Sequence, residues 1–285
     1  MKKREWKDVI VGGQAVIEGV MMKNGDRVAI AVRTPEKDIS MKTLKAKSYF
    51  GKLSKIPFVR GVTMLIDTLV LGIGALTFSA SESLGEKEEK VSSFSMFLTM
   101  LFSFVMAIGI FIILPLWLTK FFTSDHGFVF NAIDGGLRIL IFLLYILGIS
   151  LMPDIKRVFQ YHGAEHKSVA CYEAGDELTV KNARKHSRLH PRCGTTFIFL
   201  VLVVSIILFS LIVSSSWLVK FGVRILFIPL VASISYEILR FAGKHFDNPI
   251  MKVIIAPGLA SQLITTKEPD DKQLEVALKA LKAVV

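Results

Sequence analysis

Two histidines and a glutamate lie close together near the middle of the chain, in the order His162-Gly163-Ala164-Glu165-His166. In an α-helix, residues four positions apart stand on one face about one turn from each other, so both imidazoles can reach a single metal ion. Glu165 can face the same ion, either as a general base acting on water or as a further ligand. The spacing therefore predicts a site for a divalent metal, with zinc as the expected ion.

A second group of possible ligands follows about 25 residues later. His190 and Cys193 are three positions apart in a turn before an apolar segment, and one of them is the expected third ligand. Glu237 lies near the end of another apolar segment, where an acid is costly unless it is paired or coordinating, so it is an additional ligand or acid in this prediction. Cys171 falls on the opposite side of the helix from His162, and we expect it to be a small buried residue.

Alternatives remain open for these residues. The H-x-x-E-H order is that of the inverted zincins, yet a pattern of five residues also arises by chance, and a basic histidine loop can bind headgroup phosphates. A closed site with four ligands, His162, His166, His190 and Cys193, leaves no position for water. Such a site would indicate a non-catalytic scaffold or regulator. A small transporter is a third alternative, which the few polar residues recognised in the apolar segments disfavour.

The elements that must position these residues are mostly helices in a membrane. The chain has 285 residues, is 52% hydrophobic and carries a formal net charge of +11, a combination unusual for a soluble domain. Four apolar segments are long enough to cross a bilayer. A fifth, 56–80, contains Arg60 and Asp67 and is expected to be an interfacial helix. Arg138 and Arg224 are expected to snorkel toward the membrane surface. The four expected spans are 94–118, 130–152, 195–218 and 222–242.

The distribution of basic residues predicts the orientation of the spans. Lys and Arg number 16 before residue 94, one in 119–129, eight in 153–193, one in 219–221 and six in 243–285. By the positive-inside rule both termini and the 153–193 connection face the cytoplasm. The same rule explains the basic N-terminal region without nucleic acid, which we do not expect as a partner. A cleavable signal peptide and a structural disulfide are not expected either.

The two ends of the chain are expected to form a small α+β subdomain. Strands are predicted at 9–11, 15–22 and 28–32, with a turn at Asn24-Gly25, and a helix is predicted after Pro269. A further helix is predicted over 154–174, between Pro153 and Gly175. The expected fold is a mainly α membrane protein with four transmembrane helices and this cytoplasmic subdomain. Its regions are 1–55 (β-hairpin region), 56–93 (interfacial helix and charged linker), 94–152 (first two spans), 153–193 (histidine and cysteine loop), 194–242 (last two spans) and 243–285 (C-terminal segment with a terminal helix).

Four stretches of sequence carry a family resemblance: 12–22 (GGQAVIEGVMM), 161–168 (YHGAEHKS), 187–195 (SRLHPRCGT) and 265–278 (TTKEPDDKQLEVAL). They resemble the YqhQ-like family of bacterial integral membrane proteins, which are described as predicted metal-dependent enzymes. The resemblance implies a multi-pass protein of the bacterial inner (cell) membrane. It also adds Glu18, Asp270 and Asp271 as acids of the shared motifs, with Glu18 expected on the surface or facing the site.

The function expected from these features is metal-dependent hydrolysis at the cytoplasmic face of the membrane. His162, His166 and either His190 or Cys193 would bind the metal, and Glu165 would be the general base. The lipid bilayer is an expected partner. A membrane-associated peptide or a lipid headgroup is the expected substrate, and the alternative scaffold would bind a partner protein. With only four spans, the chain is also a candidate homo-oligomer.

Overall fold

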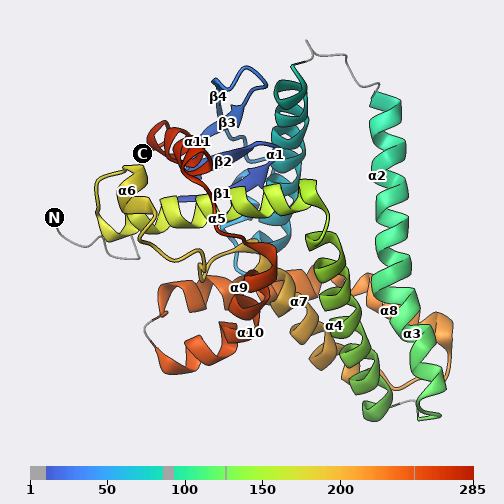
Figure 1. Ribbon diagram of the computed structural model, residues 1–285. Helices are drawn as coiled ribbons and strands as arrows, with labels where there is room; N and C mark the ends of the chain where they lie inside the picture. Colours follow the sequence, from blue (N-terminus) through green and yellow to red (C-terminus); the bar gives the residue numbers. More distant parts are fainter. Residues whose placement is uncertain (1–10, 86–92, 126, 247) are drawn as a thin grey trace.

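The computed structural model describes residues 11–85, 93–125, 127–246 and 248–285. It consists of one four-stranded antiparallel sheet and a larger set of helices (Figure 1). The strands are β1 (Val11–Val16), β2 (Gly19–Asn24), β3 (Arg27–Arg33) and β4 (Ile39–Lys45). The main helices are α1 (Val59–Leu84), α2 (Ser93–Ile108), α3 (Leu114–Leu118), α4 (Phe128–Ser150), α5 (Pro153–Ala174), α7 (Gly194–Ser210), α8 (Trp217–Leu226), α9 (Ile228–Lys244), α10 (Pro249–Thr265) and α11 (Asp271–Lys282). Shorter helical turns are Gly51–Lys55, Gly109–Ile113, Thr119–Phe121 and α6 (Val180–Ala183).

The sheet is a meander in which each strand pairs with the next. The hairpin turn between β2 and β3 lies at Gly25-Asp26, as the Asn-Gly pair indicates, and Gly25 has the positive φ of 61° that such turns require. The apolar run 15–22 is not one strand, because a two-residue turn at Ile17-Glu18 divides it between β1 and β2. A fourth strand, β4, which the sequence did not predict, begins after residue 38 and pairs with β3.

Helices cover both faces of the sheet. On one face, Val20, Met22 and Ala29 pack against α5 and α11 in a common core. On the other face, Met21 and Ile30 pack against α1. Burial on both faces explains why β2 and β3 read as continuous apolar runs and not as alternating strands. The N-terminal sheet and the C-terminal helix thus form one subdomain, as expected, to which α1 and α5 also contribute.

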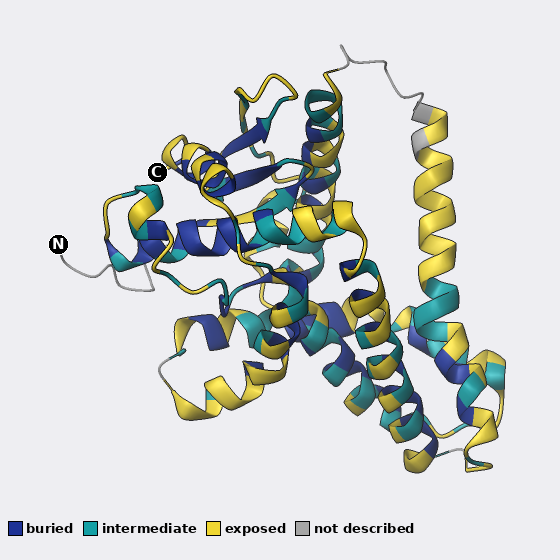
Figure 2. Ribbon diagram, in the orientation of Figure 1, coloured by how far each residue is buried: buried dark blue, intermediate teal, exposed yellow. Residues whose placement is uncertain are grey.

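A second group of helices packs around α7. This helix contacts α4, α9 and α10, and α5 crosses between this bundle and the sheet (Figure 1). Residues 249–265 were expected only as part of a C-terminal tail, but α10 packs along α7 as part of the bundle. Helix α2 stands apart from the other helices (Figure 1), and Figure 2 shows it exposed over most of its length.

Among the described residues, three helices are long and apolar enough to cross a membrane: Val59–Leu84, Phe97–Phe121 and Phe128–Ser150. The pair α8 and α9 adds a fourth if it forms one span bent by 47°. The bend falls where Pro229 lacks an N–H for the helical ladder. These helices are consistent with a membrane protein. The expected third span is shorter than predicted, because α7 ends at Ser210. Segment 56–80, expected to be interfacial, belongs to a helix of spanning length that also packs on the sheet.

Candidate metal centre

Helix α5 carries His162, Glu165 and His166 on the face toward the sheet and the 188–193 turn. Its bounds, Pro153–Ala174, agree with the prediction to within one residue. Pro153 fits the first turn because its missing N–H would have no helical partner there, and Gly175 ends the helix with a φ of 78°. The i, i+4 spacing of the two histidines brings their ring centroids to 4.4 Å from each other.

Backbone carbonyls fix the orientation of both imidazoles. His162 Nδ1 lies 2.8 Å from the carbonyl oxygen of Thr265, and His166 Nδ1 lies 2.6 Å from that of Arg188. A carbonyl oxygen only accepts, so each Nδ1 must carry the proton and donate it. Each Nε2 therefore carries no proton and presents its lone pair toward Cys193, which is the form in which histidine binds a metal. Burial also lowers the pKa of His166, so this ring is neutral at pH 7.

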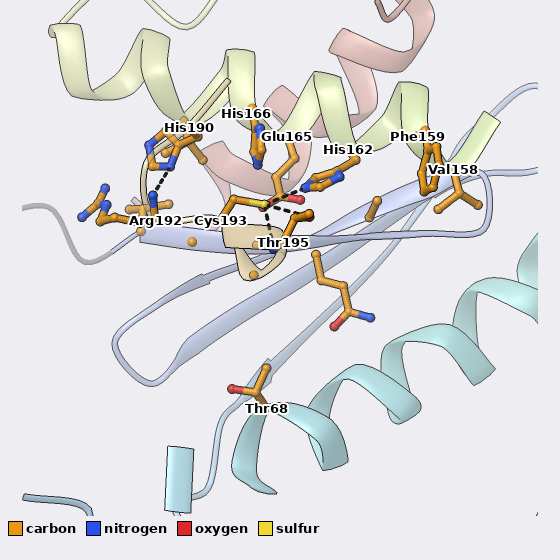
Figure 3. Close-up of a pocket in the computed structure, with 17 residues that line it drawn as sticks. Thr68, Val158, Phe159, His162, Glu165, His166, His190, Arg192, Cys193 and Thr195 are labelled. Carbon is orange, nitrogen blue, oxygen red and sulfur yellow. Dashed lines mark hydrogen bonds between the residues drawn. The ribbon is translucent and has the colours of Figure 1, made fainter. Parts of the chain in front are cut away.

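Cys193 brings a sulfur to the two free nitrogens. Its Sγ lies 3.2 Å from Nε2 of His162, and one ligand atom from each of His162, His166 and Cys193 lies within 4.8 Å of the other two. Figure 3 shows the three side chains converging from α5 and from the start of α7. Cys193 is the N-cap of α7 and accepts a hydrogen bond from the N–H of Thr195.

Glu165 is buried beside these groups. Its side chain is next to β1, where the N–H of Gly13 donates to the carboxylate. Burial raises the pKa of Glu165 to about 7. One oxygen, Oε2, is buried and has no hydrogen-bond partner among the described residues. A carboxyl group in this state can hold or release a proton near neutral pH, as a general base or acid requires.

Two glycines allow the chain to approach these side chains closely. A Cβ on Gly163 would come within 2.1 Å of the carbonyl oxygen of Lys267, so only glycine lets the 265–268 segment lie against α5. That contact also delivers the Thr265 carbonyl to His162. A Cβ on Gly13 would lie 2.6 Å from the carbonyl oxygen of Met21 and 3.1 Å from Cδ of Glu165.

A cavity of about 390 Å³ opens onto the three possible ligands and Glu165 (Figure 3). Its walls come from β1, α5, the 190–195 turn and, through Thr68, from α1. The volume is within the range of pockets that bind small molecules. Gly12 and Gly13 belong to β1 and line this cavity.

His190 lies at the edge of the group and has other partners. Its Nε2 is 3.3 Å from a carboxylate oxygen of Glu173, and Arg192 forms an ion pair with the same carboxylate. Its backbone N–H donates to the side chain of Gln262, which also donates to Thr196. The structure thus brings Cys193 to the two histidines and holds His190 beside Glu173. The ring centroid of His190 lies 5.6 Å from that of His166.

The structure does not bring Glu237 to this group. Both carboxylate oxygens accept from the guanidinium of Arg60, and one also accepts from the N–H of Phe58. The expectation of Glu237 as a ligand is therefore corrected to that of an ion-pair partner between α9 and α1. Cys171 is buried in the core under the sheet, as expected, and burial raises its pKa to about 11. It also lies near Asp176 and His186 in a second possible metal group.

Several contributors to the site were missed by sequence reasoning. The carbonyls of Thr265 and Arg188 and the backbone of Gly13 act through main-chain atoms, which leave no signal in residue type. Gly13, Arg188 and Thr265 do lie within the motif stretches 12–22, 187–195 and 265–278, which carried the family resemblance. Of the acids that the resemblance added, Glu18 pairs with Arg157 and Asp271 pairs with Arg184. Asp270 caps α11 through a capping box with Gln273.

Comparison with known proteins identifies the family of the chain. Residues 56–285 match the model of a family described as "Protein of unknown function (DUF1385)". The chain belongs to this family. It is also 36% identical to "Uncharacterized protein YqhQ" of Bacillus subtilis (strain 168), over 94% of this chain and 90% of that protein. The YqhQ-like resemblance is thereby confirmed. No solved structure matches the chain.

Proposed function

We propose that this protein is a zinc-dependent hydrolase acting at a membrane surface, with a membrane-associated peptide or a lipid headgroup as substrate. The observation that carries the proposal is the state of the two imidazoles. Both donate Nδ1–H to backbone carbonyls, and both present an unprotonated Nε2 to the sulfur of Cys193. Two nitrogens and one sulfur form a donor set that zinc accepts, and three protein ligands are typical of catalytic zinc sites.

The residues of the chain have distinct roles in this proposal. His162, His166 and Cys193 hold the metal, and Thr265 and Arg188 fix the rings. When bound by these residues in an open site, zinc would supply a Lewis acid that activates water for attack on a carbonyl or phosphoryl centre. Glu165, with one oxygen unpartnered and a pKa of about 7, accepts a proton from the attacking water and returns it to the leaving group.

The surroundings of the cavity support a membrane-associated substrate. Helix α4 ends at Ser150, just before α5, and α7 begins at Gly194, directly after Cys193. The cavity therefore lies where apolar helices begin and end, which supports a position at the level of a membrane surface. We further propose that this surface is the cytoplasmic face of the bacterial cell membrane, on the basis of the charge distribution in the connections.

A hydrolysis assay comparing wild type with Glu165→Gln tests the proposal. Purified protein supplied with zinc is incubated with vesicles of phosphatidylglycerol and phosphatidylethanolamine, and separately with membrane peptides, and products are identified by mass spectrometry. We expect products from wild type and a rate lower by about 10²- to 10⁴-fold in the variant, with zinc content unchanged.

Equal rates for the two proteins would contradict the role of Glu165. Stoichiometric zinc without turnover on either class of substrate, together with loss of thermal stability on chelation, would instead favour the scaffold. A closed structural site of that kind needs a fourth ligand, and His190, the nearest candidate, lies against Glu173.

A further inference from the structure

A group of charged side chains lies inside the helical bundle, apart from the metal centre. Asp134 and Arg138 of α4 form an ion pair at 2.8 Å, and Arg224 of α8 pairs with the same carboxylate at 3.1 Å. Arg138 is only 5% exposed and Arg224 1% exposed. The expectation that both arginines snorkel to the membrane surface is therefore wrong. They are retained inside because Asp134 lies between them.

This group carries more positive than negative charge. Two guanidinium groups share one carboxylate, and their remaining N–H groups are only partly used: Arg138 donates to Ser205 and Arg224 to Asn131. The Nε of each arginine is buried and has no partner among the described residues. A buried cation without full compensation is costly in a medium of low dielectric constant. An additional anion would remove this cost.

A cavity of about 280 Å³ leads to the two arginines. It is lined by residues of several helices, including Phe197 and Val201 of α7 and Ala232 of α9. Its polar lining consists of Arg138, Ser205 and Arg224, and all its other lining residues are apolar. Exposed residues, Ile198 and Ile228, also line it, so the cavity opens at the outside of the bundle and extends inward to the side chains of Arg138 and Arg224.

We propose that this cavity binds an anionic amphiphile with a single acyl chain, whose carboxylate or phosphate contacts Arg138 and Arg224. An inorganic anion would lose its hydration among apolar walls, and a neutral lipid would leave the guanidinium charge uncompensated. The volume is slightly below that of typical small-molecule pockets, which fits one chain better than two. The opening at Ile198 and Ile228 lies on an apolar surface, where such a molecule enters from a bilayer.

This site is distinct from the proposed hydrolytic centre. Ser205, which marks the level of the arginines on α7, lies twelve residues after Cys193, or about 18 Å along a helix. The headgroup of a bound amphiphile is therefore not presented to His162 and His166. The proposal thus stands independently of whether zinc binds or hydrolysis occurs.

Binding of labelled amphiphiles to the purified full chain tests the proposal. Immobilised protein in dodecyl maltoside is incubated with tritiated palmitate or, separately, with tritiated lysophosphatidate, and retention is competed with the unlabelled compound or with neutral monopalmitoylglycerol. We expect saturable retention of at least one anion and no competition by the neutral compound. Retention of palmitate alone would identify a carboxylate ligand, and retention of lysophosphatidate a phosphate ligand.

Two variants act on different parts of the site. Arg138→Gln removes one charge while Asp134 keeps Arg224, and Ala232→Phe fills the cavity but keeps both arginines. We expect Arg138→Gln to weaken retention roughly 10- to 100-fold, the range for a lost hydrogen bond to a charged group. We expect Ala232→Phe to weaken retention at least as much, because its ring occupies the cavity. The exposed Arg240→Gln on α9 is the matched control and should bind as wild type.

Zinc content should stay at the wild-type level in all three variants, so failure of this proposal is separable from failure of the hydrolase proposal. Absence of saturable retention for both anions would overturn the proposal. Equal competition by monopalmitoylglycerol would also overturn it, as would wild-type retention by both Arg138→Gln and Ala232→Phe.

Discussion

The two imidazoles of the candidate centre are oriented by the backbone carbonyls of Thr265 and Arg188 as well as by Cys193. In both His162 and His166, Nδ1 lies against a backbone carbonyl and the other ring nitrogen lies beside the sulfur of Cys193. Glu165 adds a buried carboxyl group with one unpartnered oxygen. These features together support the proposed metal centre.

Among the site residues, the sequence predicted correctly only those contacts that join residues within one helical turn. The i, i+4 relation of His162 and His166 follows from helix geometry alone. The choice between His190 and Cys193 stayed open, because it depends on how a turn folds back on α5. Glu237 was misassigned, because its partner Arg60 lies 177 positions away in sequence. The pairing of Arg224 with Asp134, 90 positions apart, was missed for the same reason, whereas Asp134 and Arg138 have the local i, i+4 spacing and were overlooked.

The placement of Glu237 gives a prediction about metal content. Because Glu237 pairs with Arg60 outside the candidate centre, we expect Glu237→Gln to keep the zinc content of wild type. Loss of the bidentate ion pair should lower the midpoint of thermal unfolding by a few degrees, in line with about 1 kcal/mol. Both quantities are measured on protein purified in detergent. A variant depleted of zinc but fully folded would show that Glu237 is a ligand after all.

At the scale of elements, packing of the two chain ends onto α5 is what builds the site. The C-terminal segment delivers Thr265 to His162, and β1 delivers Gly13 to Glu165. The periodic patterns predicted α5 and α11 and the hairpin turn at Gly25. They did not predict β4 or the position of α10, because neither segment has a pattern that indicates its tertiary partner. The break at Ile17-Glu18 was missed because the run 15–22 is apolar almost throughout.

Gly163→Ala should disturb the site through the C-terminal segment. Its Cβ would lie 2.1 Å from the Lys267 carbonyl oxygen, so this segment must move away and take the Thr265 carbonyl from His162. We expect destabilisation by about 1–3 kcal/mol and reduced zinc content. Gly74→Ala is the matched control, because its Cβ would meet nothing within 4 Å. That helical substitution should be neutral or stabilising by up to about 1 kcal/mol. Similar effects of the two changes would argue against the close approach.

Leu274→Ala should weaken the subdomain formed by the two ends of the chain. Leu274 is fully buried in α11 against the core shared with the sheet and α5. We expect a loss of about 2–5 kcal/mol, the range for large-to-small changes in a core. Thermal unfolding measures the loss, with the exposed Lys282→Ala on the same helix as control, expected within about 0.5 kcal/mol of wild type. A small effect at Leu274 would mean that α11 is not part of the folded core.

At the scale of the whole molecule, a sheet subdomain sits on one side of a helical bundle, and α5 lies between them (Figure 1). Composition alone indicated the apolar helices. Their lengths differed from expectation, because α7 is short and the α8 and α9 pair is bent. Helix α2 exposes large apolar side chains along its length, including Phe97, Phe102 and Phe104. Such a surface fits a lipid environment better than water.

The expected orientation can be tested with single introduced cysteines. Ser124 lies in the loop before α4, and Ser187 lies near the candidate metal centre; both are exposed. If the sheet side faces the cytoplasm, a membrane-impermeant maleimide should label Ser124→Cys in intact cells and should label Ser187→Cys only after the cells are opened. Labelling of Ser187→Cys alone in intact cells would show the reverse orientation. The native cysteines, Cys171 and Cys193, are buried and give a low background.

The metal content of the purified full chain tests the central claim most directly. We predict close to one zinc per chain by plasma mass spectrometry, lost in His162→Ala and in Cys193→Ala. The zinc should be retained in Cys171→Ala, which disrupts the second possible metal group. Folded wild-type protein that binds no zinc even after zinc is added would contradict the account, as would zinc that His162→Ala and Cys193→Ala leave in place.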